Sequence, residues 1–182
     1  DLSKMKKAIH NSIALTLVIG VVLTVIGLVF NDPILKAIGV PNDVFSEAST
    51  YLSIYFWSLI FVMIYNMGSG ILRSVGDSKR PLYFLIFSSI INIVLDFLFV
   101  KNFGFGVAGA GYATLIAQAI SAIMVMYVLM KTEDSYKVVL KDIKFDKEIL
   151  LKIIKIGLPT GFQQSIVSLS NVIVQSYINV YG

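Results

Sequence analysis

Long apolar segments alternate with short polar breaks along the chain. Five such segments cover about residues 8–30, 47–73, 80–102, 107–131 and 148–180, and each is long enough to cross a bilayer as a helix of about 20 residues. Proline, glycine and charged residues interrupt the pattern between them, in NDP, GDSKRP and KNFGFG and in the polar stretch that follows residue 131. The pattern predicts an all-α fold: a polytopic membrane protein with five transmembrane helices.

Composition supports the membrane assignment and excludes several classes of function. The chain is 57% hydrophobic and only 14% charged, whereas a soluble domain carries about 25% charged residues. It has no cysteine, and His10 is its one histidine, so neither a disulfide nor a cysteine or histidine metal cluster is expected. Residues 104–109, GFGVAG, match a dinucleotide fingerprint, but a membrane helix rather than a strand precedes them. We therefore expect no enzyme, no cofactor and no resident metal.

The basic residues predict the orientation of the helices. Thirteen of the 15 lysines and arginines lie in the N-terminal segment, the loop around residues 73–80 and the stretch 131–155, and only Lys36 and Lys101 lie in the other loops. This asymmetry follows the positive-inside rule. It predicts a multi-pass protein of the plasma membrane whose chain starts in the cytoplasm, and it explains the basic pI without nucleic acid.

Two pairs of polar residues interrupt the third and fourth apolar segments. Asn92 and Asp96 are four residues apart and so share one helix face, about 6 Å apart along the axis. Thr114 and Gln118 have the same spacing on the next helix, and counting from the intervening turn places the two pairs at matching depths. A carboxylate inside a membrane helix costs about 2.5–3.5 kcal/mol on insertion scales. We interpret Asp96 as a group that binds a cation or a proton, with a hydrogen-bonded clamp between helices as the alternative.

A third polar pattern runs along the fifth segment. Its members recur at helical spacing and form one stripe that either faces a water-filled cavity or bonds to neighbouring helices: Gln164, Ser168, Asn171, Gln175 and Asn179. Tyr65 and Asn66 in the second segment are weaker candidates for lining a cavity, with packing as the alternative. Residues 132–147 form the one long polar connection, predicted to be either a solvated linker or a segment resting on the membrane surface.

Several motifs resemble the multidrug and toxic compound extrusion (MATE) family of transporters. The stretch 51–81, which ends in LRSVGDSKRP, resembles the family's fourth helix and following loop. INIVLDFLF followed by GFGVAGAGYATLIAQ resembles its fifth and sixth helices, and GLPTGFQQSI resembles the opening of its seventh. The resemblance implies that the five segments are helices three to seven of a twelve-helix, two-lobe antiporter. Residues 1–131 would then be the second part of the N-terminal lobe, 132–147 the cytoplasmic interlobe linker, and 148–182 the first helix of the C-terminal lobe.

The resemblance also implies a function and a site. Members export drugs and other amphiphilic organic compounds in exchange for sodium ions or protons, and the partners of this chain would be such a compound, membrane lipid and the remaining helices of the same protein. In sodium-binding members an aspartate from helix one joins residues that correspond here to Asn92, Asp96 and Thr114. Two departures are present: QQSIVSLSN lacks the acidic residue that some members carry in helix seven, and Ile60 stands about where a proline often lies in helix four.

Two other functions remain as alternatives. A flippase for lipid-linked sugars of the same superfamily shares the fold but tends to place basic residues in its cavity, and here basic residues lie only at the ends of the segments. A membrane assembly subunit that does not transport would use the polar pairs as clamps and would bind no cation.

Overall fold

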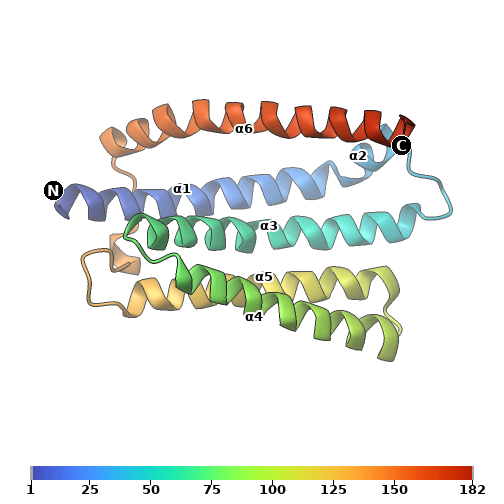
Figure 1. Cartoon of the computed structure of the whole chain (residues 1–182), viewed down its shortest axis with the longest axis horizontal. Helices are drawn as coiled ribbons and strands as arrows, with labels where there is room; N and C mark the ends of the chain where they lie inside the picture. Colours follow the sequence, from blue (N-terminus) through green and yellow to red (C-terminus); the bar gives the residue numbers. More distant parts are fainter. Residues whose placement is uncertain (1, 182) are drawn as a thin grey trace.

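The structure, a computed structural model, describes residues 2–181 without the side chains of residues 172, 173 and 175–181. Five long helices run lengthwise beside one another: α1 (Leu2–Val29), α3 (Phe45–Ser74), α4 (Lys79–Asp96), α5 (Gly106–Lys131) and α6 (Lys147–Tyr181). Their order across the molecule is α6, α1, α3, α5, α4 (Figure 1). A short α2 (Asn31–Ala37), a π-helical segment η1 (Phe97–Asn102) and a 3-10 turn η2 (Leu140–Asp142) complete the described chain.

The helices confirm the predicted segments closely. Within the described residues, four helices are long and apolar enough to cross a membrane: α1, α3, α4 with η1, and α5. The first begins six residues earlier than predicted, because the helix continues through the lysine-rich N-terminal segment. The fifth predicted span falls in α6, which continues through Pro159 and whose last turns have no described side chains; its crossing of the membrane stays a prediction.

Small residues let α3 pack closely against α1 and α5. A Cβ atom built on Gly20 of α1 would lie 3.2 Å from the side chain of Ile60, and one built on Gly111 of α5 would lie 3.2 Å from that of Ile54. The hydroxyl of Thr24 also donates a hydrogen bond of 3.1 Å to the main-chain carbonyl of Phe56. Close approach of this kind is the main source of helix association in lipid, where there is no hydrophobic drive between helices.

A hydrophobic core joins the helices at the end of the bundle where α1 begins. It combines residues of α1, α3, α5 and the linker: Ile9, Ile13, Ile71, Leu72, Val125, Leu129 and Val138. The opposite end is closed by Asn31, whose amide donates to Ser49 O at 2.8 Å and to the Ser53 hydroxyl at 2.6 Å. Large apolar side chains elsewhere are exposed along the helices, especially on α4, as expected for surfaces that meet lipid or other membrane helices.

The linker is mostly exposed but is attached to the helices at one buried residue. Val138 is 2% exposed and lies in the core, and its backbone N–H donates to Leu129 O at 2.8 Å. The polar stretch after α5 therefore turns back and packs on the helices it has just left.

Candidate cation site and a polar cavity

The polar pair of α4 lies on the face that packs against α5. Ser88, Asn92 and Asp96 follow one another at intervals of four residues, and α4 packs mainly against α5. The hydroxyl of Ser88 is satisfied by a 3.1 Å hydrogen bond to Leu85 O. By contrast, Asn92 Nδ2 and Asp96 Oδ1 are both buried and have no hydrogen-bond partner. Two unsatisfied polar atoms thus lie one helical turn apart on the same face.

Such atoms are rare in folded proteins and call for an explanation. A buried donor or acceptor without a partner costs about 1–3 kcal/mol, and more when the group is charged. A cation or a proton at Asp96 would satisfy the carboxylate oxygen. The amide of Asn92 can turn by 180°, which exchanges its nitrogen and oxygen and would present an oxygen to the same cation.

The helix changes its hydrogen-bonding pattern directly after Asp96. In η1 the N–H of Phe103 donates to Leu98 O at 3.0 Å, five residues back. This wider π-type turn is common at functional sites. A Cβ atom built on Gly109 of α5 would lie 3.1 Å from the backbone of Phe99, so the π segment packs directly against the start of α5. Sequence reasoning missed this segment, because nothing in the apolar run distinguishes a π turn from an α turn.

The structure brings α4 and α5 together but does not bond the two polar pairs. Thr114 and Gln118 are half-buried on α5, and within the described residues no hydrogen bond joins either side chain to Asn92 or Asp96. A π-helical turn rises less per residue than an α-helical one. The depth of Asp96 counted from the loop at the α-helical rise is therefore too large. Within the described residues no hydrogen-bonded clamp forms between these two helices, and both interpretations of Asp96 stay predictions.

The remaining predicted cavity residues lie apart from this pair. Tyr65 donates a 2.7 Å hydrogen bond to Pro81 O at the start of α4 and packs on the hydrophobic core, which is the packing role left open for it. Asn66 is exposed. On α6, Gln164, Ser168 and Asn171 are exposed, as are the apolar residues between them, while the side chain of Gln175 lies outside the described residues.

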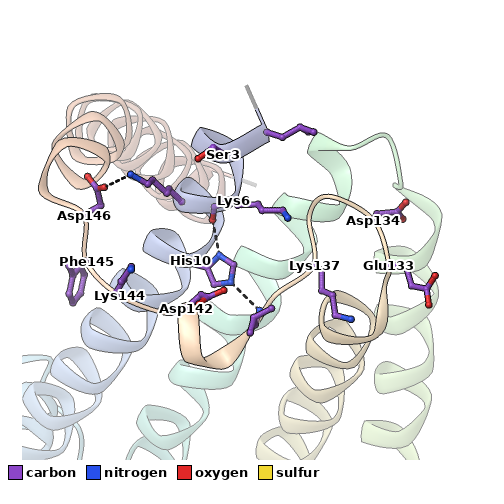
Figure 2. Close-up of a pocket in the computed structure, with 13 residues that line it drawn as sticks. Ser3, Lys6, His10, Glu133, Asp134, Lys137, Asp142, Lys144, Phe145 and Asp146 are labelled. Atoms are coloured by element: carbon purple, nitrogen blue, oxygen red, sulfur yellow. Dashed lines mark hydrogen bonds and ion pairs between the residues drawn. The ribbon is translucent and has the colours of Figure 1, made fainter.

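A second polar region, which sequence reasoning missed, lies at the lysine-rich end of the bundle. A cavity of about 690 Å³ separates the start of α1 from the linker (Figure 2). Its lining mixes charges of both signs and includes Lys6, Lys7, Lys137, Lys144, Glu133, Asp134, Asp142 and Asp146. The cavity runs along the seam where the linker meets the start of α1, and residues from both sides line it.

His10 fixes the linker to α1. The backbone N–H of Val139 lies 3.0 Å from His10 Nε2, and Lys6 O lies 2.7 Å from His10 Nδ1 (Figure 2). A backbone N–H can only donate and a carbonyl can only accept, so Nε2 is the acceptor and Nδ1 carries the proton. The buried imidazole is therefore held as one neutral tautomer with both nitrogens satisfied.

Two further contacts hold the end of the linker. The amide of Asn11, which is fully buried, donates to Asp146 O at 2.9 Å. The Asp146 carboxylate lies 3.3 Å from the Lys7 ammonium. The backbone N–H of Ile149, followed by the Lys7 ammonium, lowers the pKa of the Asp146 carboxyl. The only sequence signal for this seam was a histidine and an asparagine at the boundary between the lysines and the first apolar run.

Together these features define a class: a multi-pass helical membrane protein with unsatisfied polar atoms on the face of α4 that packs against α5, and with a docked polar linker before α6. The MatE family model matches residues 1–98. The chain belongs to this family of membrane transporters.

Individual relatives agree with this assignment. Over 98% of its length the chain is 36% identical to the probable multidrug resistance protein YoeA of Bacillus subtilis. A solved MOP superfamily transporter from Pyrococcus furiosus covers 93% of the chain with a TM-score of 0.83 and 31% identity. An inward-facing multidrug resistance MATE family transporter covers 87% with a TM-score of 0.72 and 27% identity.

The chain spans only part of each relative. It covers 40% of the Bacillus subtilis protein, 38% of the Pyrococcus furiosus chain and 42% of the inward-facing transporter.

Proposed function

We propose that the full-length protein containing this chain is a secondary antiporter of the plasma membrane. It exports drugs or other amphiphilic organic compounds in exchange for sodium ions or protons, and the start of this chain lies in the cytoplasm. The family assignment supports transport, the name of the Bacillus subtilis relative supports multidrug compounds as substrates, and the asymmetry of the basic residues supports the orientation.

The observation that carries the coupling mechanism is the pair of buried, unpartnered atoms Asp96 Oδ1 and Asn92 Nδ2 on α4. Asp96 supplies the negative charge that a cation or a proton needs, while Asn92 and Thr114 supply neutral oxygens. Gln118, one turn beyond Thr114, is a further ligand or cavity residue. The site is completed by helices of the full-length protein that are not part of this chain.

Coupling follows from the cost of the uncompensated carboxylate. Binding of the ion neutralises Asp96 and changes how α4 and η1 pack on α5, and this biases the rocking of the two lobes around a central cavity. The polar stripe of α6, with Gln164, Ser168, Asn171 and Gln175, lines that cavity. Organic substrate leaves as the ion enters.

A lipid-linked sugar flippase would need cations in its cavity to hold a pyrophosphate. The described membrane helices carry their basic side chains near their ends, which favours efflux over that alternative. An assembly subunit that does not transport would show no dependence on ions.

The decisive experiment replaces Asp96→Asn in the full-length protein. The change keeps the size of the side chain and removes the charge, so coupled efflux should be abolished while expression stays near normal. Asn92→Ala and Thr114→Ala should weaken ion affinity more mildly, and Gln118→Ala should have a smaller effect than Thr114→Ala. The assay is drug efflux against imposed sodium and proton gradients, with surface expression measured in parallel. Unchanged ion dependence in Asp96→Asn would show that Asp96 is structural.

A further inference from the structure

The docked linker does not pass beyond the ends of the helices. It folds back alongside them and bonds to residues inside α1 and α5. Val139 is bonded to His10, which lies eight residues after the start of α1 at Leu2, or about 12 Å along the helix axis. Val138 is bonded to Leu129, two residues before the end of α5. The linker therefore returns to the level of the first apolar turns of α1 and the last turn of α5.

At this level the linker exposes both apolar and basic side chains. Leu140 is 58% exposed and Phe145 is 49% exposed. Lys137, Lys141 and Lys144 lie between and beside them, are exposed, and form no ion pair within the described residues. Lys137, Lys144 and Phe145 also border the cavity between the linker and α1. Figure 2 shows Lys144 and Phe145 side by side on the part of the linker that passes α1.

Carboxylates near this surface are partly engaged elsewhere. Asp146 is paired with Lys7, and Asp134 accepts a 2.9 Å hydrogen bond from the Thr132 hydroxyl. Glu133 and Asp142 remain as negative groups in the same cavity lining as Lys137 and Lys144. The net charge of residues 137–145 is positive. The bonds to His10 and Leu129 hold the backbone of this segment against the helices.

We propose that residues 137–145 form a binding surface for the headgroups of anionic phospholipids. Leu140 and Phe145 insert at the boundary between headgroups and acyl chains, and the three lysines extend their ammonium groups to lipid phosphates. Anionic lipid complements this surface in charge and lies at its depth, and a juxtamembrane basic segment attracts it. This surface is separate from Asp96 and requires neither substrate nor an ion gradient.

The test uses the full-length protein with other cysteines removed and a bimane fluorophore on Leu140→Cys. The protein is placed in vesicles of equal parts phosphatidylcholine and phosphatidylglycerol, in which one lipid or the other carries a nitroxide at a shallow acyl position. Both leaflets have the same composition, so the result does not depend on orientation. We expect quenching by labelled phosphatidylglycerol to correspond to a roughly five-fold local enrichment over phosphatidylcholine.

Charge and position controls make the test specific. Changing Lys137, Lys141 and Lys144 together to Gln should bring the two lipids to equal quenching, and added salt should move the ratio the same way. Lys36→Gln with Lys101→Gln, at the other membrane face, should leave the preference unchanged.

Three results would overturn the proposal. Absence of quenching by both lipids would mean that protein covers Leu140. Equal quenching by both lipids in the parent protein would mean that the surface has no headgroup preference. A fluorophore on Ser135→Cys, in the outer turn of the linker, should be quenched little, and equal quenching there would mean that the segment has no defined depth. None of these results would bear on ion-coupled efflux, which the Asp96 variant tests separately.

Discussion

Replacement of Gly68 by alanine tests the close packing of α3 against α5. A Cβ atom at this position would lie 2.8 and 2.9 Å from the two Cγ atoms of Val125, and 3.4 Å from a methyl group of Leu129. Both neighbours are fully buried. Because Val125 is β-branched and has one strongly preferred rotamer in a helix, it cannot swing aside, so the helices must separate.

Gly70, two residues further along α3, is the matched control. A Cβ atom there meets nothing within 4 Å. Both changes gain the helix propensity of alanine, about 0.5–1 kcal/mol, and that gain cancels in the comparison. Only Gly68→Ala pays the cost of overpacking, about 1–3 kcal/mol. We therefore expect Gly68→Ala to be less stable than Gly70→Ala by about that amount.

The assay is thermal unfolding of the full-length protein in detergent, followed by the loss of the monodisperse peak in size-exclusion chromatography. Gly70→Ala should keep or slightly raise the midpoint temperature, and Gly68→Ala should lower it. A second change, Val125→Ala, should partly restore stability to Gly68→Ala by removing the methyl groups in conflict, although it leaves less apolar packing. Equal midpoints for the two glycine variants would refute the packing described for α3 and α5.

Three further predictions address topology, the cavity and the linker. A cysteine at Ser78 should react with impermeant reagents from the cytoplasm and one at Asn42 from outside; reaction from the same side would contradict the arrangement of the spans. In the full-length transporter, Gln164→Cys should react with small polar thiol reagents and be protected by drug, whereas Ile166→Cys should not react; silence at both would make the stripe an interhelical contact. Asn11→Ala should weaken linker docking by about 1–3 kcal/mol and speed tryptic cleavage of the linker, and an unchanged cleavage rate would contradict the docking.

The positions of the helices could be predicted because the membrane imposes a strong local rule. A spanning segment must satisfy its backbone within itself and must be apolar over about 20 residues, and both properties can be read from neighbouring residues. The same rule made Asp96 conspicuous, because a carboxylate in such a run carries a cost that stands out against its surroundings. The loop between α4 and α5 was equally legible, with Gly104 at φ +68° and Gly106 at φ +55°, backbone conformations that glycine adopts without strain.

Other features depend on contacts between residues far apart in the chain, and only the tertiary structure decided them. The linker reads as a polar stretch, yet Val138 lies in the core. Its backbone N–H bonds to Leu129 O, 9 residues back, and the N–H of Val139 bonds to His10, 129 residues back. The π turn after Asp96 packs against α5 at Gly109, where a Cβ atom would lie 3.1 Å from the backbone of Phe99, a contact between helices that the sequence does not show. The chain alone thus determines which segments enter the membrane and which residue is costly there. The packing of the helices determines that Asp96 Oδ1 has no partner, because a missing hydrogen bond is a property of the surrounding space.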